Sequence, residues 1–150
     1  MQIPFPELNP TELPMSLITW SDDLSVCIPA MDDDHRQLVS MINELYDAVQ
    51  EGHGEELTDS ILNRLVKYVQ FHFAREELFM RTYGFSGYAE HKKHHEIMVA
   101  AVGNLFQKHA EDKTSIDQNK LLAFLKSWLL KHIKGEDFKY KVFFQENPLD

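Results

Sequence analysis

The chain has 150 residues, one cysteine and a net charge of −9, with 24 acidic residues against 15 basic ones. A chain of this length forms one domain with a single substantial core, and its acidic balance disfavours nucleic acid and anionic membranes as partners. The lone Cys27 excludes an internal disulfide and any cluster of thiolate ligands. The sequence contains no run of 18 apolar residues, so we predict no membrane span.

The first thirty or so residues are predicted to form an extended arm, because prolines prevent a long helix there. These prolines are Pro4, Pro6, Pro10, Pro14 and Pro29. Trp20 and Ile28 are expected to anchor the arm on the core. The start of the chain lacks the basic residues and the apolar stretch of a secretory signal, so we expect a cytoplasmic protein. We place an N-terminal extension at residues 1–17 and the folded domain at residues 18–145.

Four segments then carry apolar residues at helical spacing. They are expected at about residues 32–50, 55–83, 87–112 and from 115 or 116 to at least 133. Their predicted inward positions are Leu38, Met41, Ile42, Leu45 and Val49; Leu57, Ile61, Leu65, Tyr68, Phe71 or His72, Phe79 and Tyr83; Ile97, Val102, Leu105 and Phe106; and Leu121, Leu122, Phe124, Leu125, Trp128 and Leu129. Strand alternation is not evident. We predict an all-α fold, an up-down-up-down four-helix bundle with an extended N-terminal arm.

Two pairs of potential metal ligands lie on these helices. His72 and Glu76 are four residues apart, and so are His91 and His95; residues at this spacing share one side of a helix. His94 offers a second pairing with His91, but the pairing with His95 keeps to the apolar face. Either pair is able to point into the bundle.

The other two helices each contribute one histidine. His35 opens the first helix and His132 lies late in the fourth. With His72 late in the second helix and His91 early in the third, all four fall towards the same end of an antiparallel bundle.

Asp137 is a less certain member of this group. It follows His132 by five residues, which on an ideal helix places the two side chains about 140° apart. Gly135 between them would permit a local widening of the helix, or a helix end, that turns Asp137 inward.

One such pair is weak evidence for a metal, and a lone inward histidine is more often a core residue with a backbone partner. Burying five imidazoles and two carboxylates without compensation would cost several kcal/mol per group, and a metal centre offsets that cost. Seven ligands exceed one tetrahedral zinc and suit two octahedral irons with bridging carboxylates. The Glu-x-x-His motif of ferritin-like oxidases and the zinc-protease HExxH are both missing.

The chain resembles the hemerythrin family, and its single-domain bacterial members in particular. The resemblance covers about residues 18–141. It rests on the stretches "ITWSDDLSVCIPAMDDDHRQLVSMINELY", "HFAREELFM", "YAEHKKHH" and "WLLKHIKGEDFKY". It implies a four-helix bundle that binds O2 reversibly at a non-haem centre of two Fe ions (Fe2+/Fe3+) with an oxo or hydroxo bridge.

The resemblance also implies a role for each ligand. One iron takes His91, His95 and His132, and the other takes His35 and His72 and keeps one open position. Glu76 and Asp137 bridge the two irons, and the family has an Asp at the place of Asp137. The apolar lining of the O2 pocket is expected to be Leu38, Phe73, Trp128, Leu129 and Ile133.

The remaining notable residues are not expected to be ligands. Cys27 stands where many relatives carry glycine, and the acids next to His35 are interpreted as charges of the first helical turn. We expect His53 in a loop and both His94 and His109 on the surface.

The predicted function is to carry, store or deliver O2 without catalysis, to a recipient that the sequence does not identify. A sensor is one alternative, although sensors of this family are usually fused to a signalling domain. An enzyme that consumes peroxide or NO is another. It would need an acid or base near the open position, and no spare polar residue is expected in the lining. Iron storage would need more room than one bundle offers.

Overall fold

The computed structural model describes residues 16–147, except for the side chain of Glu56. Most of the predicted extension at residues 1–17 therefore lies outside the described residues, and its boundary with the domain at residues 18–145 stays a prediction. Within the described part, no helix has the length and hydropathy needed to cross a membrane.

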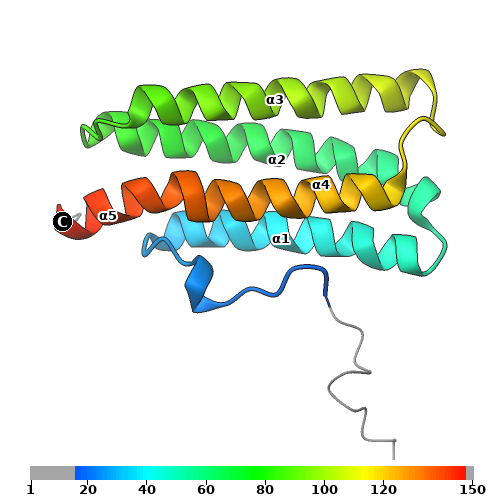
Figure 1. The fold of residues 1–150 in the computed structure, drawn as a ribbon, viewed down its shortest axis with the longest axis horizontal. Helices are drawn as coiled ribbons and strands as arrows, with labels where there is room; N and C mark the ends of the chain where they lie inside the picture. The colour runs from blue at the N-terminus through cyan, green and yellow to red at the C-terminus, as the bar shows by residue number, and fades with distance from the viewer. Residues whose placement is uncertain (1–15, 148–150) are drawn as a thin grey trace, which may run out of the picture.

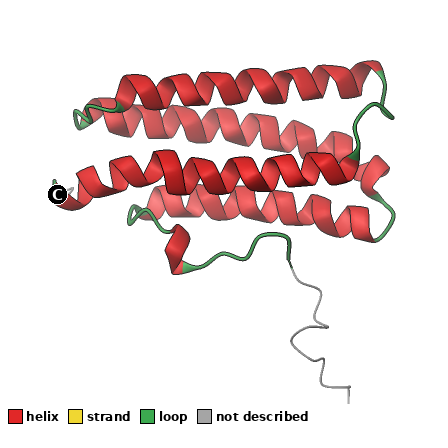
Figure 2. Cartoon of the chain, viewed as in Figure 1, coloured by secondary structure: helices red, strands yellow, loops and turns green. Residues whose placement is uncertain are grey.

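The fold is an antiparallel bundle of four helical rods with short connections (Figures 1 and 2). The described part has no strand, which confirms the all-α prediction. A short 3-10 turn (Asp22–Leu24) precedes the rods. These are α1 (Pro29–Gln50), α2 (Gly54–Thr82), α3 (Tyr88–Glu111) and a fourth rod made of α4 (Gln118–Lys131), a π-helical turn (His132–Asp137) and α5 (Phe138–Glu146). α1 packs against α2 and α4, and α2 packs against α3.

The first helix starts at Pro29, three residues earlier than predicted. Proline suits this position because its fixed φ fits the first helical turn, where a backbone N–H has no partner inside the helix. Asp32 then ties the arm to α1. It accepts hydrogen bonds from the Val26 backbone N–H at 2.8 Å and from the Ser25 hydroxyl at 2.6 Å. Ile28 is buried and Trp20 partly buried, as predicted.

The fourth rod begins at Gln118, two or three residues later than predicted. Asp117 sets this start, because its carboxylate caps the helix. It accepts hydrogen bonds from the backbone N–H groups of Asn119 at 2.9 Å and Lys120 at 3.1 Å.

The core lies between the four rods, and most of the predicted inward residues belong to it. The prediction was wrong for five of them, which are 37–68% exposed: Leu57, Tyr83, Ile97, Phe106 and Phe124. At the open choice on α2, His72 is buried and Phe71 is 52% exposed. Two buried histidines explain the error on α3. His91 and His95 define its inward side, and Ile97, two residues after His95, points about 200° away.

His109 was also predicted wrongly, since it is 4% exposed rather than on the surface. It follows Val102 by seven residues, which is close to two full turns, and so continues the inward side of α3. Its Nε2 lies 2.5 Å from a carboxylate oxygen of Asp59. The polar side chain of His109 thus has a polar partner although it is buried at the end of α3.

Two glycine substitutions test the local backbone. A Cβ at Gly135, in the π-helical turn, would meet no atom within 4 Å, whereas Gly84 has φ +74°. We expect Gly135→Ala to raise the free energy of unfolding, or to lower it by less than about 1 kcal/mol, because alanine favours helix. Gly84→Ala should lower it by about 1 kcal/mol or more, because alanine is strained at positive φ. Urea unfolding followed by circular dichroism measures both. Equal losses would show that the π-helical turn requires glycine.

Candidate metal centre

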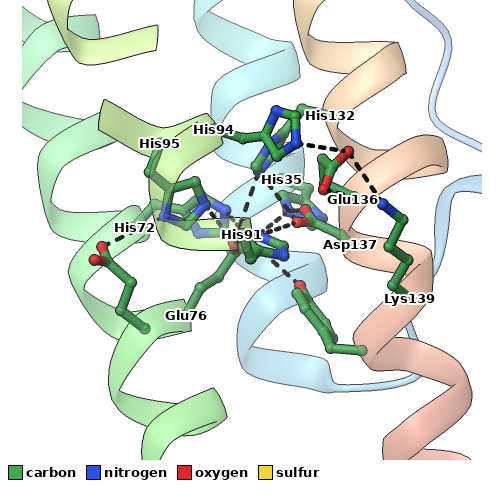
Figure 3. A network of polar contacts seen from close by, with 12 residues as sticks. His35, His72, Glu76, His91, His94, His95, His132, Glu136, Asp137 and Lys139 are labelled. Carbon is green, nitrogen blue, oxygen red and sulfur yellow. Dashed lines mark hydrogen bonds and ion pairs between the residues drawn. The ribbon is translucent and has the colours of Figure 1, made fainter. Parts of the chain in front are cut away.

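The seven predicted ligands meet at one end of the bundle. His35 comes from the start of α1, His72 and Glu76 from α2, His91 and His95 from the start of α3, and His132 and Asp137 from the two ends of the π-helical turn. Figure 3 shows their side chains converging from all four rods. Each of the seven is at most 5% exposed. Their convergence at one end agrees with the prediction from chain order.

Glu76 lies at the centre of this cluster and divides the histidines into two groups. Its Oε1 is 2.6 Å from Nε2 of His72 and 3.3 Å from Nε2 of His35. Its other oxygen faces the remaining imidazoles. Oε2 lies 3.1 Å from Nε2 of His91, 3.1 Å from Nε2 of His95 and 3.6 Å from Nε2 of His132. One carboxylate thus presents a separate oxygen to each group.

Asp137 divides the histidines in the same way. Its Oδ2 is 2.9 Å from Nε2 of His35, and its Oδ1 is 3.1 Å from Nε2 of both His91 and His132. Two overlapping sets result, in each of which the ligand atoms lie within 4.8 Å of one another. They are Glu76, His91, His95, His132 and Asp137, and His35, His72, Glu76 and Asp137. The carboxylates belong to both.

The π-helical turn is what brings Asp137 inward. On an α-helix, residues five apart diverge, but a π-helix closes its hydrogen bonds between residues i and i+5. His132 and Asp137 stand at the two ends of this turn, and both face the cluster. The predicted widening around Gly135 is therefore found.

The polar atoms of the cluster fit a metal better than they fit each other. Buried Nε2 atoms of His72 and His132, and both carboxylate oxygens of Asp137, lack a hydrogen bond of good geometry among the described residues. Yet these atoms lie 2.6–3.1 Å from oxygen or nitrogen atoms of neighbouring side chains. Lone pairs that converge on the space between side chains are what a metal ion satisfies. The imidazole and carboxylate donors suit iron or a similar transition metal.

Protons balance the charge of the cluster when no metal is present. Burial disfavours the charged form of His72, but the neighbouring Glu76 and Asp34 carboxylates raise its pKa to about 10. Burial likewise opposes the charge on His91, yet Asp137 and Glu76 raise its pKa to about 9. Burial alone would raise the pKa of Glu76, and the imidazoles around it, His72 first, hold that pKa well below its usual range.

Asp34 supports the cluster from outside, a role that the sequence analysis missed. It was interpreted as a first-turn charge, but it is 2% exposed and its Oδ2 accepts from Nδ1 of His72 at 3.0 Å. The Tyr68 hydroxyl donates to Asp34 at 3.1 Å, and Arg75 lies 3.3 Å from it. The spacing of residues in the sequence does not predict this role, because the partners of Asp34 come from another helix.

Tyr140 is the second functional residue that the sequence analysis missed. Its hydroxyl donates to Oε1 of Glu76 at 3.2 Å, and its side chain is fully buried. Burial raises its pKa well above 10, so the hydroxyl keeps its proton. Tyr140 follows Asp137 by three residues, and that helical spacing was the available signal. Tyr140 is thus a polar group beside Glu76, outside the predicted apolar lining.

The predicted apolar lining lies around the cluster. Leu38, Phe73, Leu129 and Ile133 are at most 3% exposed, and Trp128 is partly buried. Two rings stack directly on ligands. Phe73 lies 3.8 Å from His95 and Trp128 5.4 Å from His132 between ring centroids. Whether these residues line an O2 pocket stays a prediction.

Three further histidines were predicted not to be ligands, and none of them belongs to the two sets. His53 is exposed, and His94 is exposed and faces Glu136 at 3.4 Å. His109 is paired with Asp59, as described above.

A helical bundle with five imidazoles around two shared carboxylates defines a metal-binding protein of the four-helix class. A family model, the hemerythrin HHE cation binding domain, matches residues 27–143. The chain belongs to the hemerythrin family.

Individual relatives agree with this assignment. A bacteriohemerythrin from Pseudomonas aeruginosa is 34% identical over 126 residues, which cover 84% of this chain and 80% of that protein. A myohemerythrin from Riftia pachyptila is 37% identical over 122 residues, 81% of this chain and 89% of that protein. A crystal structure of wild-type hemerythrin has a TM-score of 0.76 at 28% identity, covering 84% of this chain and 96% of that one.

Asp34 and Asp33 form a matched pair of substitutions. Asp34→Asn removes the buried charge that orients His72, and we expect it to weaken metal binding about 10- to 100-fold. Asp33→Asn makes the same chemical change one residue earlier, on a side chain that is 74% exposed and paired with Arg36. It should leave the affinity unchanged within about 2-fold. Anaerobic competition for Fe(II) with a coloured chelator measures both affinities. Equal effects of the two variants would show that Asp34 does not support the site.

Proposed function

We propose that the chain binds O2 reversibly at a carboxylate-bridged centre of two iron ions and so transports, stores or delivers oxygen. One observation carries the proposal. Glu76 and Asp137 each place one carboxylate oxygen next to His35 and the other next to His91. This is the arrangement that two bridged metal ions require. Membership of the hemerythrin family supports it. A cytoplasmic location stays a prediction.

The two sets are unequal, which favours one side for O2. The set with three histidines has five ligands, and the set of His35 and His72 has four. An ion held by the smaller set would therefore leave more room for O2. Two ferrous ions held by the seven residues would supply the electrons that O2 binding takes up and that O2 release returns.

The chain's own residues exclude water from that position and orient the carboxylate beside it. Leu38 follows His35 by three residues, and Ile133 directly follows His132. Both apolar side chains are fully buried, and they exclude water. The Tyr140 hydroxyl holds Oε1 of Glu76, the oxygen on the side of His35 and His72. A hydroxyl there keeps the carboxylate oriented.

Tyr140 also favours a second candidate function, an enzyme that consumes peroxide or NO. Its hydroxyl is a proton donor within the site, which such an enzyme needs. The two functions differ in one measurable respect: a carrier returns to its ferrous state when oxygen is removed, and an enzyme turns over.

A cycle of visible spectra tests the proposal. The iron-loaded, reduced protein should hold about two iron ions per chain and have a weak visible spectrum under argon. Air should produce a charge-transfer band that disappears when oxygen is removed again. Direct passage to a stable oxidised form would favour the enzyme or a sensor. Failure to bind iron would reject the proposal.

His91 and His94 provide a matched control for the iron count. His91→Ala removes a buried ligand and should lower the iron content to about one ion per chain or less. His94→Ala makes the same change one turn away on α3, where the side chain is 44% exposed, and should leave the content unchanged.

The raised histidine pKa values predict proton release on metal binding. His72, with a pKa of about 10, and His91, with a pKa of about 9, both carry a proton at neutral pH. A metal needs their free nitrogen lone pairs, so loading must expel those protons. Apparent affinity for Fe(II) should rise with pH and level off near about pH 10. Anaerobic titration in weak buffer with a pH indicator measures the release. Loading near pH 7.5 without proton release would contradict these pKa values.

A further inference from the structure

The groove between α3 and α4 lies beside one side of the metal centre. It has a volume of about 390 Å³, and its walls include Ile97, Phe124, Trp128 and Lys131. Ile97 is 68% exposed and Phe124 37% exposed, so apolar side chains reach solvent there. A second hollow continues along the same two helices and shares Phe124 with the first. The two together form an elongated apolar surface, which we call the α3/α4 groove.

A ligand side chain forms part of the groove wall. His132 lines the groove, and at 5% it is the most exposed of the seven proposed ligands. The partly buried Trp128 lines the same groove, and its ring stacks on His132 with 5.4 Å between centroids and 19° between planes. In Figure 3, His94 and Glu136 lie beside His132 at this edge of the cluster. The proposed metal position therefore lies directly behind the imidazole of His132 and the Trp128 ring stacked on it, which both line the groove.

The charge of the chain is divided between its two layers. Residues 16–87, which contain α1 and α2, hold 13 acidic and five basic residues. Residues 88–147, which contain α3 to α5, hold eight acidic residues and ten lysines. The layer that carries the groove, nearer the viewer in Figure 1, is thus slightly basic on an acidic protein. Exposed Lys131 lines the first hollow together with Glu136, and Lys108 and Lys120 line the second together with Asp117, so three lysines stand against two acidic residues.

A competing groove between α2 and α3 has the opposite character. It reaches the ligand His95, but Glu77 and Glu96 line it. Its aromatic residue, Phe73, is 3% exposed, so the ring that stacks on His95 does not reach the surface as Trp128 does. This groove is less suited to an acidic partner.

We propose that the α3/α4 groove docks a small acidic protein that carries single electrons and returns oxidised iron to the ferrous state. The inference rests on the proposed function, since it requires two redox-active irons. Two visits of a reduced carrier deliver one electron each, so that two ferric ions become ferrous and two carrier molecules leave oxidised. No bond of the chain forms or breaks. The basic rim attracts the carrier, and the apolar floor brings it against Trp128 and His132.

Charge reversal at two lysines tests the docking. The probe is a reduced, acidic [2Fe–2S] ferredoxin, mixed anaerobically with the oxidised holoprotein in a stopped-flow spectrometer. Lys131→Glu places a negative charge in the groove. Lys67→Glu makes the same change in net charge on an exposed position of α2. At low salt, Lys131→Glu should slow the second-order reduction by about 5-fold or more, and Lys67→Glu by less than about 2-fold. The difference should shrink near about 0.5 M salt.

Two controls separate the possible failures. Dithionite supplies a small reductant that needs no docking surface, and it should reduce all three proteins at similar rates. If dithionite yields no ferrous protein that responds to O2, the proposed function fails before the docking is tested. If dithionite succeeds and the ferredoxin reduces both variants alike, or does not reduce the protein, the docking proposal is wrong. Self-association of the wild type that Lys131→Glu abolishes, seen by sedimentation, would assign the groove to a second copy and also overturn it.

Discussion

Two buried carboxylates that share five imidazoles are the constraint on which the rest of the structure depends. Glu76 and Asp137 are almost fully buried, and burial of unpaired charges is costly. Each helix must therefore present its histidines at one height and on one side. This requirement selects the inward face of α3, where His91 and His95 are buried and Ile97 is exposed. The hydrophobic core then fills the remaining length of the bundle.

The π-helical turn is the backbone adjustment that this constraint demands. A regular helix would carry Asp137 away from His132, and only one of the two could then face the cluster. The turn leads directly into α5, on which Tyr140 reaches Oε1 of Glu76. One local widening thus turns a proposed ligand inward and precedes the residue that donates a hydrogen bond to Glu76. π-Helical turns of this kind occur frequently at functional sites.

The sequence predicted the bundle and the meeting of the seven side chains because both follow from helical periodicity and chain order. The prediction failed for residues whose burial or role depends on contacts between helices. Phe124 has the right spacing for the core, yet it borders the groove between α3 and α4. His109 was expected outside, but its partner Asp59 lies on another helix. The same limit hid Asp34, whose role depends on Tyr68 and Arg75, more than thirty residues along the chain.

The surroundings of the two ligand sets differ in a way that suits two separate tasks. On the side of His72, the imidazole is held by Asp34, a carboxylate 2% exposed, and the neighbouring ligand His35 is 0% exposed. That side is closed to solvent, which favours the reversible O2 binding proposed above. On the other side, His132 lines a groove beside the partly buried Trp128, whose ring stacks on it. The closed side therefore suits the O2 binding proposed above, and the side of His132 suits the proposed entry of electrons.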